Sequence, residues 1–217
     1  MKLKIDLHVH TSRSSDAFTS LNQLGPSCKR AGIDGIAITE HNQVTDILPS
    51  EIIALKGIEV SSKVGHIIGL GICEPIERGL SPEETIIKIR AQGGVALLPH
   101  PYDLFRPNVR PERLKVMPDA IEVLNAASLF ARVAWPPAKE FAEKRRIAQV
   151  AGSDSHIPQT IGRAYTVIEA NSPDEESILD AIRSGRTQPV GRQVSIGERT
   201  RKIVLNVRRS FYGLSNW

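Results

Sequence analysis

The chain has 217 residues, of which 41% are hydrophobic and 24% charged, a composition typical of a globular protein rather than a disordered one. This length can bury a core in one domain or two small ones, and no apolar run approaches the roughly 20 residues that cross a bilayer. The net charge is +4, and the two cysteines match neither a disulfide framework nor a zinc-ribbon spacing, so we expect reduced thiols in a cytoplasmic protein.

Strands and helices alternate along the chain. The first strand is expected at residues 3–9, and no signal peptide is expected because residues 1–4 run directly into it. The sequence then predicts a helix at 20–31 capped by Gly32, strands at 35–39, 52–60 and 66–72, a helix from Ser81 to Gly93, strands at 95–98 and 120–124, a helix at 137–145, strands at 147–151 and 165–169, and a helix from Ser172 to Gly185. This alternation predicts an α/β fold with a largely parallel sheet, open or closed into a barrel.

Basic residues gather near the C-terminus. They are Arg199, Arg201, Lys202, Arg208 and Arg209. Such a segment can contact nucleic acid or another polyanion, or it can be a solvated tail or a packed edge strand. The charge alone does not choose between these interpretations.

All six histidines fall at the ends of predicted strands. His8 and His10 end the first strand, His41 follows the second, His66 opens the strand at 66–72, His100 follows the strand at 95–98, and His156 follows the strand at 147–151. Glu59 and Asp154 also lie at strand ends, and Asp16 lies in the loop after the first strand. Because the carboxyl ends of parallel strands meet on one face, we expect these side chains to converge.

The local spacings suit metal binding. His8 and His10 point to one side of an extended strand because side chains alternate with a period of two, and Asp154 and His156 repeat this spacing. Imidazole and carboxylate together suit zinc, manganese or iron, and the lack of a nearby cysteine argues against a structural zinc site. Either pair alone can be a chance feature of a strand or turn, so the prediction depends on their convergence.

Five short motifs carry a resemblance to a known family. They are Asp-Leu-His-Val-His-Thr at 6–11, Ile-Thr-Glu-His-Asn at 38–42, Gly-Ile-Glu-Val at 57–60, Leu-Pro-His-Pro at 98–101 and Gly-Ser-Asp-Ser-His at 152–156. In this order, and with Ile-Gly-Arg-Ala-Tyr-Thr at 161–166, they resemble the PHP (polymerase and histidinol phosphatase) superfamily from residue 6 to about 169. The resemblance implies a distorted (β/α)7 barrel with two or three divalent ions, zinc, manganese or iron, at the carboxyl ends of its strands.

The resemblance also implies a ligand set. When the family's ligand positions are transferred to this sequence, one ion is assigned to His8, His10, Glu59 and Asp154. A second is assigned to Glu59, His66 and His100, and a third to Asp16, His41 and His156. Glu59 bridges the first two ions in this assignment, and Glu59, Asp154 and His156 are the expected catalytic residues.

One motif departs from the family pattern, because Glu40 replaces the usual aspartate before His41. If that acid orients His41 by a hydrogen bond, Glu40 is expected to do the same from a slightly different geometry. The motifs also divide the chain into a PHP barrel domain at 1–192 and a basic C-terminal extension at 193–217, which can pack on the barrel.

The predicted reaction is hydrolysis of a phosphate ester by a metal-bridged hydroxide, in which the ions polarise the phosphate. Cationic side chains near strand ends are candidates to bind its oxygens: Arg106, Arg110, Arg132 and Arg163. We favour Arg132 and Arg163 among them, although an arginine at such a position is more often a surface residue than a phosphate clamp. Asn125 is expected either to line the substrate pocket or to cap a turn.

The substrate is expected to be a small phosphomonoester, a nucleotide or a short oligonucleotide, because PHP relatives include enzymes for each. The basic C-terminal residues favour a nucleotide substrate and are compatible with a nucleic-acid partner. Two alternatives stay open. One is a non-catalytic PHP module that binds a partner or nucleic acid, and the other is a metallohydrolase that acts on an amide or a ring.

Overall fold

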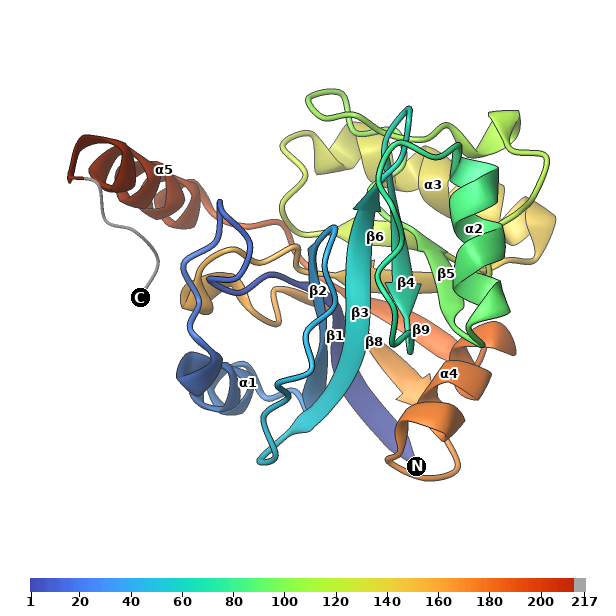
Figure 1. The fold of residues 1–217 in the computed structure, drawn as a ribbon, viewed down its shortest axis with the longest axis horizontal. Helices are drawn as coiled ribbons and strands as arrows, with labels where there is room; N and C mark the ends of the chain where they lie inside the picture. Colours follow the sequence, from blue (N-terminus) through green and yellow to red (C-terminus); the bar gives the residue numbers. More distant parts are fainter. Residues whose placement is uncertain (213–217) are drawn as a thin grey trace.

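A single nine-stranded sheet curls into a nearly closed, distorted barrel (Figure 1). The structure is a computed structural model and describes residues 1–212. The strands are β1 (Lys2–Val9), β2 (Gly35–His41), β3 (Ile53–Ser61), β4 (His66–Leu70), β5 (Val95–Leu98), β6 (Ala120–Asn125), β7 (Ala148–Gly152), β8 (Ala164–Glu169) and β9 (Thr187–Gly191). Their order across the sheet is β7-β6-β5-β4-β3-β2-β1-β8-β9.

The expected α/β barrel of the PHP type is confirmed, but its sheet is less parallel than predicted. Pairs β1/β2, β2/β3, β5/β6 and β6/β7 are parallel. Pairs β3/β4, β4/β5, β1/β8 and β8/β9 are antiparallel. The connection at 62–65 is too short for a crossover, and Ser62 donates its backbone N–H to the Gly65 carbonyl at 2.8 Å, so β4 returns beside β3 as a hairpin.

The barrel closes where the two ends of the sheet approach each other. The chain after β7 forms an isolated parallel bridge to the end of β1, between Ser155 and Val9. Ser155 donates its N–H to the His8 carbonyl at 3.3 Å and accepts the N–H of His10 at 2.9 Å. The carboxyl end of β1 is thereby fixed beside the segment that follows β7.

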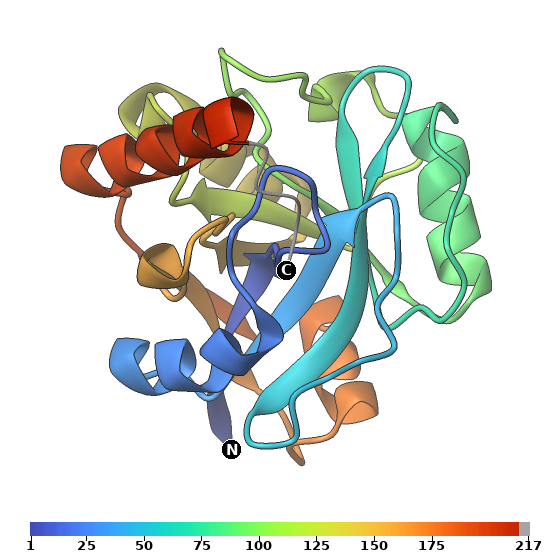
Figure 2. The same ribbon diagram turned by 60° about the vertical axis from the view of Figure 1, so that its left-hand side comes forward.

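Helices cover the sheet and close one end of it (Figures 1 and 2). They are α1 (Leu24–Ala31), α2 (Pro82–Ala91), α3 (Ala131–Arg145), α4 (Glu175–Arg183) and α5 (Ile196–Tyr212), with short 3-10 helices η1 (Leu21–Gln23), η2 (Pro111–Arg113) and η3 (Pro158–Thr160). α2 begins at a capping box in which Ser81 and Glu84 exchange hydrogen bonds, and α1 ends at Gly32 with φ 67°.

The aliphatic core places the polar site at one end of the barrel. Ile178, Leu179 and Ile182 of α4 pack in one cluster with Leu3 and Leu55, which lie near the starts of β1 and β3. α4 therefore fills the end where the parallel strands begin. The opposite end, where those strands finish, is left for polar side chains.

Three segments differ from the sequence prediction. α3 starts at Ala131 rather than at 137, because Pro136 and Pro137 lie inside the helix and do not mark its first turn. β9 was not predicted, since Pro189 makes it an unusual strand; it pairs at the sheet edge with β8. The C-terminal basic segment forms helix α5 and not a tail or an edge strand.

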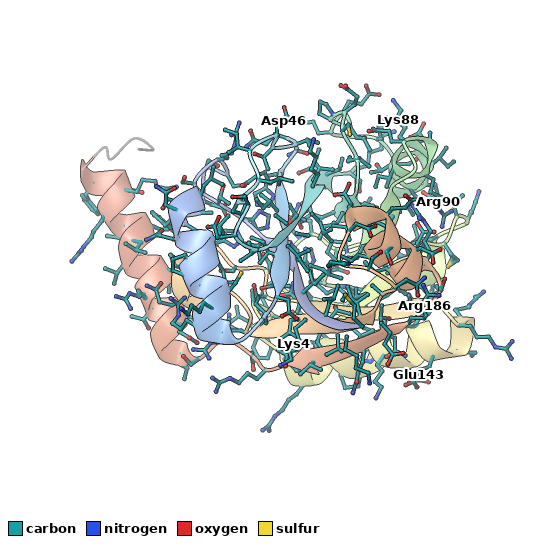
Figure 3. The ribbon with its side chains drawn as sticks, turned by 90° about the horizontal axis from the view of Figure 1, so that it is seen from below. Lys4, Asp46, Lys88, Arg90, Glu143 and Arg186 are labelled. Atoms are coloured by element: carbon teal, nitrogen blue, oxygen red, sulfur yellow. The ribbon has the colours of Figure 1, made fainter. Side chains whose placement is uncertain are left out.

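Charged side chains away from the site lie on the outer surface. Seen from below, the labelled Lys88, Arg90 and Arg186 lie at the periphery of the fold (Figure 3). Each pairs with an acid at 2.7 to 3.0 Å, and such exposed pairs contribute little to stability. None of the helices in the described part of the chain is long and apolar enough to cross a membrane.

Candidate metal centre

Nine potential ligands gather at the end of the barrel where the parallel strands finish. They are the six histidines and three acids: His8, His10, His41, His66, His100, His156, Asp16, Glu59 and Asp154. His66 belongs to this group although it opens its strand. β4 runs antiparallel to β3, so His66 pairs in register with Ser61 at the carboxyl end of β3.

Glu59 of β3 lies at the centre of the group and is almost completely buried. Five imidazoles surround its carboxylate at 3.0 to 3.5 Å, with His66, His100 and His8 around Oε1 and His41 and His10 around Oε2. A carboxylate with both oxygens facing ring nitrogens has the geometry of a ligand that can bridge two cations.

Asp154, after β7, is the second buried acid of the group. Its Oδ1 lies 3.5 Å from His10 Nε2 and 3.6 Å from His8 Nε2. Its Oδ2 accepts hydrogen bonds from the Arg106 guanidinium and, at 3.2 Å, from Asn125 Nδ2. Asp154 therefore joins the histidines of β1 to polar groups on the other side of the barrel.

Asp16 forms the outer edge of the group, and its side chain is 44% exposed. One oxygen lies 2.8 Å from His156 Nε2, and the other lies 3.6 Å from His41 Nε2. His156 is oriented from behind, because its Nδ1 lies 2.9 Å from the Asp154 carbonyl. Asp16 is the one member of the nine carried by a long loop rather than by a strand or the residues just after it.

The buried ring nitrogens show that these residues fit metal ions. His8 Nε2 and both ring nitrogens of His10 are buried without a hydrogen-bond partner among residues 1–212. Proteins leave few buried polar atoms unpaired, and nitrogens that converge at 3.4 to 3.6 Å on carboxylates are placed to share a cation. Three sets of donor atoms lie within 4.8 Å of one another: His8, His10 and Glu59; Glu59, His66 and His100; and His10, His41 and His156.

The electrostatics favour the metal-binding protonation state at some of the nine residues and oppose it at others. Burial disfavours the charged form of His8 and His41, yet the carboxylates around each ring raise its pKa, so a bound metal would displace a proton there. Burial opposes ionisation of Glu59, yet the surrounding imidazoles of His8 and His100 hold the pKa of this carboxyl well below its usual range. Burial lowers the pKa of His10 to about 3, so its ring is neutral at pH 7 and keeps a lone pair. Burial and the Arg106 charge also lower the pKa of His100. Ionised carboxylates and neutral imidazoles are the forms that bind divalent metals.

Comparison with known sequences identifies the family. A sequence model of the PHP domain matches residues 6–95, and a second one, described as PHP-associated, matches residues 136–187. The chain belongs to the PHP family. Two uncharacterized proteins of Methanocaldococcus jannaschii are similar to it. One is 36% identical over 141 residues, 57% of this chain and 82% of that protein, and the other is 34% identical over 188 residues, 81% of this chain and 76% of that protein.

Solved structures show the same PHP fold. A two-domain protein of Bacteroides vulgatus, described as containing a predicted PHP-like metal-dependent phosphoesterase, superposes with a TM-score of 0.71 at 20% identity over 94% of this chain and 70% of its own. A lesion-specific endonuclease of Pyrococcus furiosus gives 0.66 at 15% identity over 87% of this chain and 58% of its own. At these identities the comparison establishes the architecture alone.

Glu122 of β6 supports the PHP site from behind and was missed in the sequence. Its Oε1 lies 3.1 Å from His8 Nδ1, and its Oε2 accepts the backbone N–H of His100 at 2.8 Å. A carboxylate on the far nitrogen of a ligand histidine fixes the ring and its tautomer. The signal that could have found it is a charged residue inside the otherwise apolar strand 120–124.

Asp6 plays a similar supporting part within β1. Its carboxylate accepts backbone N–H groups from Ser153 at 2.8 Å, Gly162 at 2.9 Å and His8 at 3.3 Å. Burial raises the pKa of Asp6 to about 6 in spite of these hydrogen bonds. Asp6 ties β1 to the segments on both sides of Asp154, from a buried charged position between Ile5 and Leu7.

Glu40 does not contact the His41 ring, contrary to the expected hydrogen bond. Its carboxylate accepts from the Thr11 N–H at 3.0 Å, the Thr11 hydroxyl and the Ser14 hydroxyl. Ser14 Oγ in turn accepts the backbone N–H of His41 at 3.1 Å. Glu40 therefore holds the loop that carries Asp16 and acts on His41 through Ser14.

The proposed substrate-binding residues fall into two groups. Arg106 and Asn125 lie at the centre, where Arg106 contacts Asp154 and donates to Asn125 Oδ1 at 3.0 Å. Arg163 instead pairs with Glu198 at the start of α5. Arg132 is exposed on α3, with no ion pair in the described part of the chain. The structure therefore gives no geometric support to the preference for Arg132 and Arg163.

Two of the nine residues adopt a left-handed backbone conformation. His100 has φ 34° and Asp154 has φ 53°. Such angles are uncommon outside glycine and cost of order 1 kcal/mol or more each. The hydrogen bond from His100 N–H to Glu122 and the contacts of Asp154 with Arg106 and Asn125 keep both residues in this conformation.

Proposed function

We propose that the chain is a metal-dependent phosphoesterase that hydrolyses a small phosphomonoester, a nucleotide or a short oligonucleotide. The observation that carries this proposal is the buried Glu59 carboxylate within 3.0 to 3.5 Å of five imidazoles. Support comes from the PHP family and from the description of the B. vulgatus neighbour as a PHP-like metal-dependent phosphoesterase.

The ligands are assigned to three ions in the proposal. His8, His10, Glu59 and Asp154 would hold one ion, Glu59, His66 and His100 would hold a second, and Asp16, His41 and His156 would hold a third. The neutral His10 ring and the ionised Glu59 and Asp154 carboxylates support the first set. Nitrogen and oxygen donors of this kind select zinc, manganese or iron.

Divalent ions held there supply positive charge that polarises a phosphoryl group and lowers the pKa of water enough for it to act as a nucleophile near pH 7. Glu59 and Asp154 provide the negative charge that retains these ions, and both stay ionised because cationic and imidazole groups lower their pKa values against the effect of burial. His156 faces the more open side at Asp16, where it would help to hold the ion that stabilises the departing alcohol oxygen.

Arg106 and Asn125 are the proposed contacts for the phosphate oxygens. Both bind Asp154 Oδ2, so their donors already point to the place where the phosphate would meet the metal ligands. Arg106 is also held by Asp103 at 3.0 Å, which fixes the guanidinium. A fixed, planar guanidinium is well suited to a tetrahedral oxyanion.

The test begins with the wild-type protein purified without added metal. Elemental analysis by mass spectrometry should give more than one zinc, manganese or iron atom per chain. A substrate panel should contain 4-nitrophenyl phosphate, nucleoside monophosphates and bisphosphates, a short oligonucleotide and an amide. We expect phosphate release from one or more of the phosphate esters, loss of that activity with a chelator, and its return with manganese.

His10→Ala is the matched variant, because it removes a ring that faces both Glu59 and Asp154. It should lose metal and turnover together. If His10→Ala kept full activity, the group of nine ligands would not take part in the reaction. Protein that holds no metal and releases no phosphate after reconstitution would favour the non-catalytic alternative, and turnover of the amide alone would favour the amide hydrolase.

A further inference from the structure

Helix α5 lies across the mouth of the metal centre and is attached at both ends. At its start, Glu198 pairs with Arg163, and Arg199 donates at 2.9 Å to the carbonyls of Ala127 and Ser128, which follow β6. Both family matches end before this helix, at residues 95 and 187. The helix thus lies outside the segments that the two sequence models match and is fixed to the rim of the barrel.

The far end of α5 is attached to the loop that carries Asp16. Arg209 donates to the carbonyls of Ser15 and, at 2.6 Å, Ala17, and its guanidinium lies 3.8 Å from the centre of the Phe18 ring. Figure 2 shows α5 beside this loop, which follows β1. The helix is thus tied at its start to the residues after β6 and at its far end to the residues on either side of Asp16.

Lys202, in the middle of α5, points into the space that the helix covers. Its Nζ lies 3.7 Å from Asp16 Oδ2, and its side chain is 34% exposed. Within residues 1–212, Asp16 is the one acid within 4.0 Å of this ammonium group, which has three donors, so donors remain for a ligand. The donors of Arg106, in contrast, are shared among Asp103, Asn125 and Asp154.

A pocket of about 260 Å³ lies between α5 and the metal centre. Asp154 and His156 line its inner end, and the cations Arg106, Arg199 and Lys202 line one part of its wall. The rest of the lining combines apolar side chains with three polar ones: Phe105, Ala127, Leu129, Ile157 and Val194, with Asp103, Thr160 and Glu198. The apolar side chains carry no donor for a second phosphate, and the Arg199 guanidinium is already bound to the Ala127 and Ser128 carbonyls.

We propose that Lys202 binds the phosphate of the substrate and that α5 restricts the substrate to a phosphomonoester with a compact, partly apolar organic group. This inference rests on the proposed phosphoesterase function. A lysine ammonium is a mobile point charge that can follow a phosphate, whereas the fixed Arg106 fork orients it. Helix α5 forms one wall of the pocket through Glu198, Arg199 and Lys202, so the attached helix limits the size of the group that can reach Asp154 and His156.

The binding part of the proposal is tested with Lys202→Met, with Lys202→Arg as the charge-retaining variant. Arg201→Met is the control, because it removes one positive charge from the neighbouring, exposed position of α5. Calorimetric titration of the metal-loaded proteins with inorganic phosphate gives affinity without turnover. We expect Lys202→Met to weaken phosphate binding about tenfold, as for loss of one hydrogen-bonded charge, and Lys202→Arg to restore part of it.

Kinetics with 4-nitrophenyl phosphate should agree with the titration. Lys202→Met should raise KM about as much as it weakens phosphate binding, with kcat within about threefold of wild type, since the lost contact is made in the ground state and the transition state alike. Metal content should be unchanged. Unchanged phosphate affinity, or an equal loss in Arg201→Met, would overturn the role of Lys202, and so would loss of a metal ion from Lys202→Met.

The size restriction is tested by comparing 4-nitrophenyl phosphate with a 5′-phosphorylated DNA hairpin. Wild type should release phosphate from the small ester and not from the hairpin. Arg209→Ala detaches α5 from the Asp16 loop, so the rate of phosphate release from the hairpin should come closer to the rate from the small ester. Comparable wild-type rates on both substrates would refute the restriction while leaving the phosphoesterase intact. A wild type that releases phosphate from no ester would instead refute the proposed function, and the inference with it.

Discussion

The inner and outer parts of the metal centre are built differently. Glu59 and Asp154 are buried at the ends of strands, and Glu122 and Asp6 hold the neighbouring backbone and rings from behind. The outer part depends on Asp16, which is 44% exposed and lies in a loop held by Glu40 and by α5. The inner part is thus fixed by the sheet itself, whereas the outer part is positioned by segments that can move or change with little effect on the barrel.

The largest expected effect comes from removing the negative charge at the centre. Glu59→Gln keeps the size of the side chain but leaves five imidazoles around a neutral amide, so both inner ions should be lost. We expect activity to fall more than about a hundredfold, beyond the range for residues that only support a ligand. Phosphate release and metal content measure this. Glu74→Gln, at an exposed position, is the control, and a Glu59→Gln protein with wild-type metal content would show that the inner part does not depend on this carboxylate.

A smaller loss of metal affinity is expected when a residue that orients a ligand is changed. Glu122→Gln weakens the hydrogen bond to His8 Nδ1 and the orientation of that ring, without removing a proposed ligand. Metal affinity should fall about 10- to 100-fold, as for other carboxylates that orient ligand histidines. Competition with a coloured chelator gives the affinity. An affinity equal to wild type would mean that the sheet alone positions His8.

A substitution in the outer part of the centre should cost less activity and should remove one ion rather than all of them. Asp16→Asn should remove about one ion and leave the inner two, so activity should fall about tenfold or less, the scale of one charge-assisted contact. Metal stoichiometry separates this result from a general collapse of the site. If Asp16→Asn empties the whole centre, the two parts are not independent, and the contrast drawn between them is wrong.

The smallest effect on chemistry is expected at Asp6, where the change should appear in stability. The folded-state pKa is about 6, above the value of about 3.9 for an unfolded chain, so the folded protein holds this proton more tightly. The resulting stabilisation is complete below about pH 4 and is lost as pH rises through 6, by up to about 3 kcal/mol. Urea unfolding of Asp6→Asn in chelator should lack this part of the pH dependence. An identical profile in both proteins would show that Asp6 does not titrate in this range.

The contrast between inner and outer parts also explains what could be predicted from the sequence. Motifs at strand ends placed His8, His41 and Glu59 on one face, because strand direction and a period of two determine where such side chains point. The support from Glu122 and Asp6 was missed, since it depends on which strands are neighbours, and that order is not encoded locally. Which donors share which ion stays a prediction.

Helix α5 shows the other limit of sequence reasoning. Its apolar residues Ile203, Val207 and Phe211 recur at helical spacing, but they are exposed and do not face the barrel. The side that meets the site carries Arg199 and Lys202 instead. A helix attached through charged groups, rather than through an apolar stripe, resembles a solvated tail when only its composition is considered.

The left-handed backbone at His100 and Asp154 has a consequence for how this lineage can change. Replacing either residue with glycine would relieve backbone strain of order 1 kcal/mol, but it would remove a proposed ligand and, at 154, a charged partner of Arg106. The strained backbone is therefore retained only while the side chain is needed. A relative that keeps histidine at 100 and aspartate at 154 is therefore expected to use its metal centre, and its sequence alone identifies it.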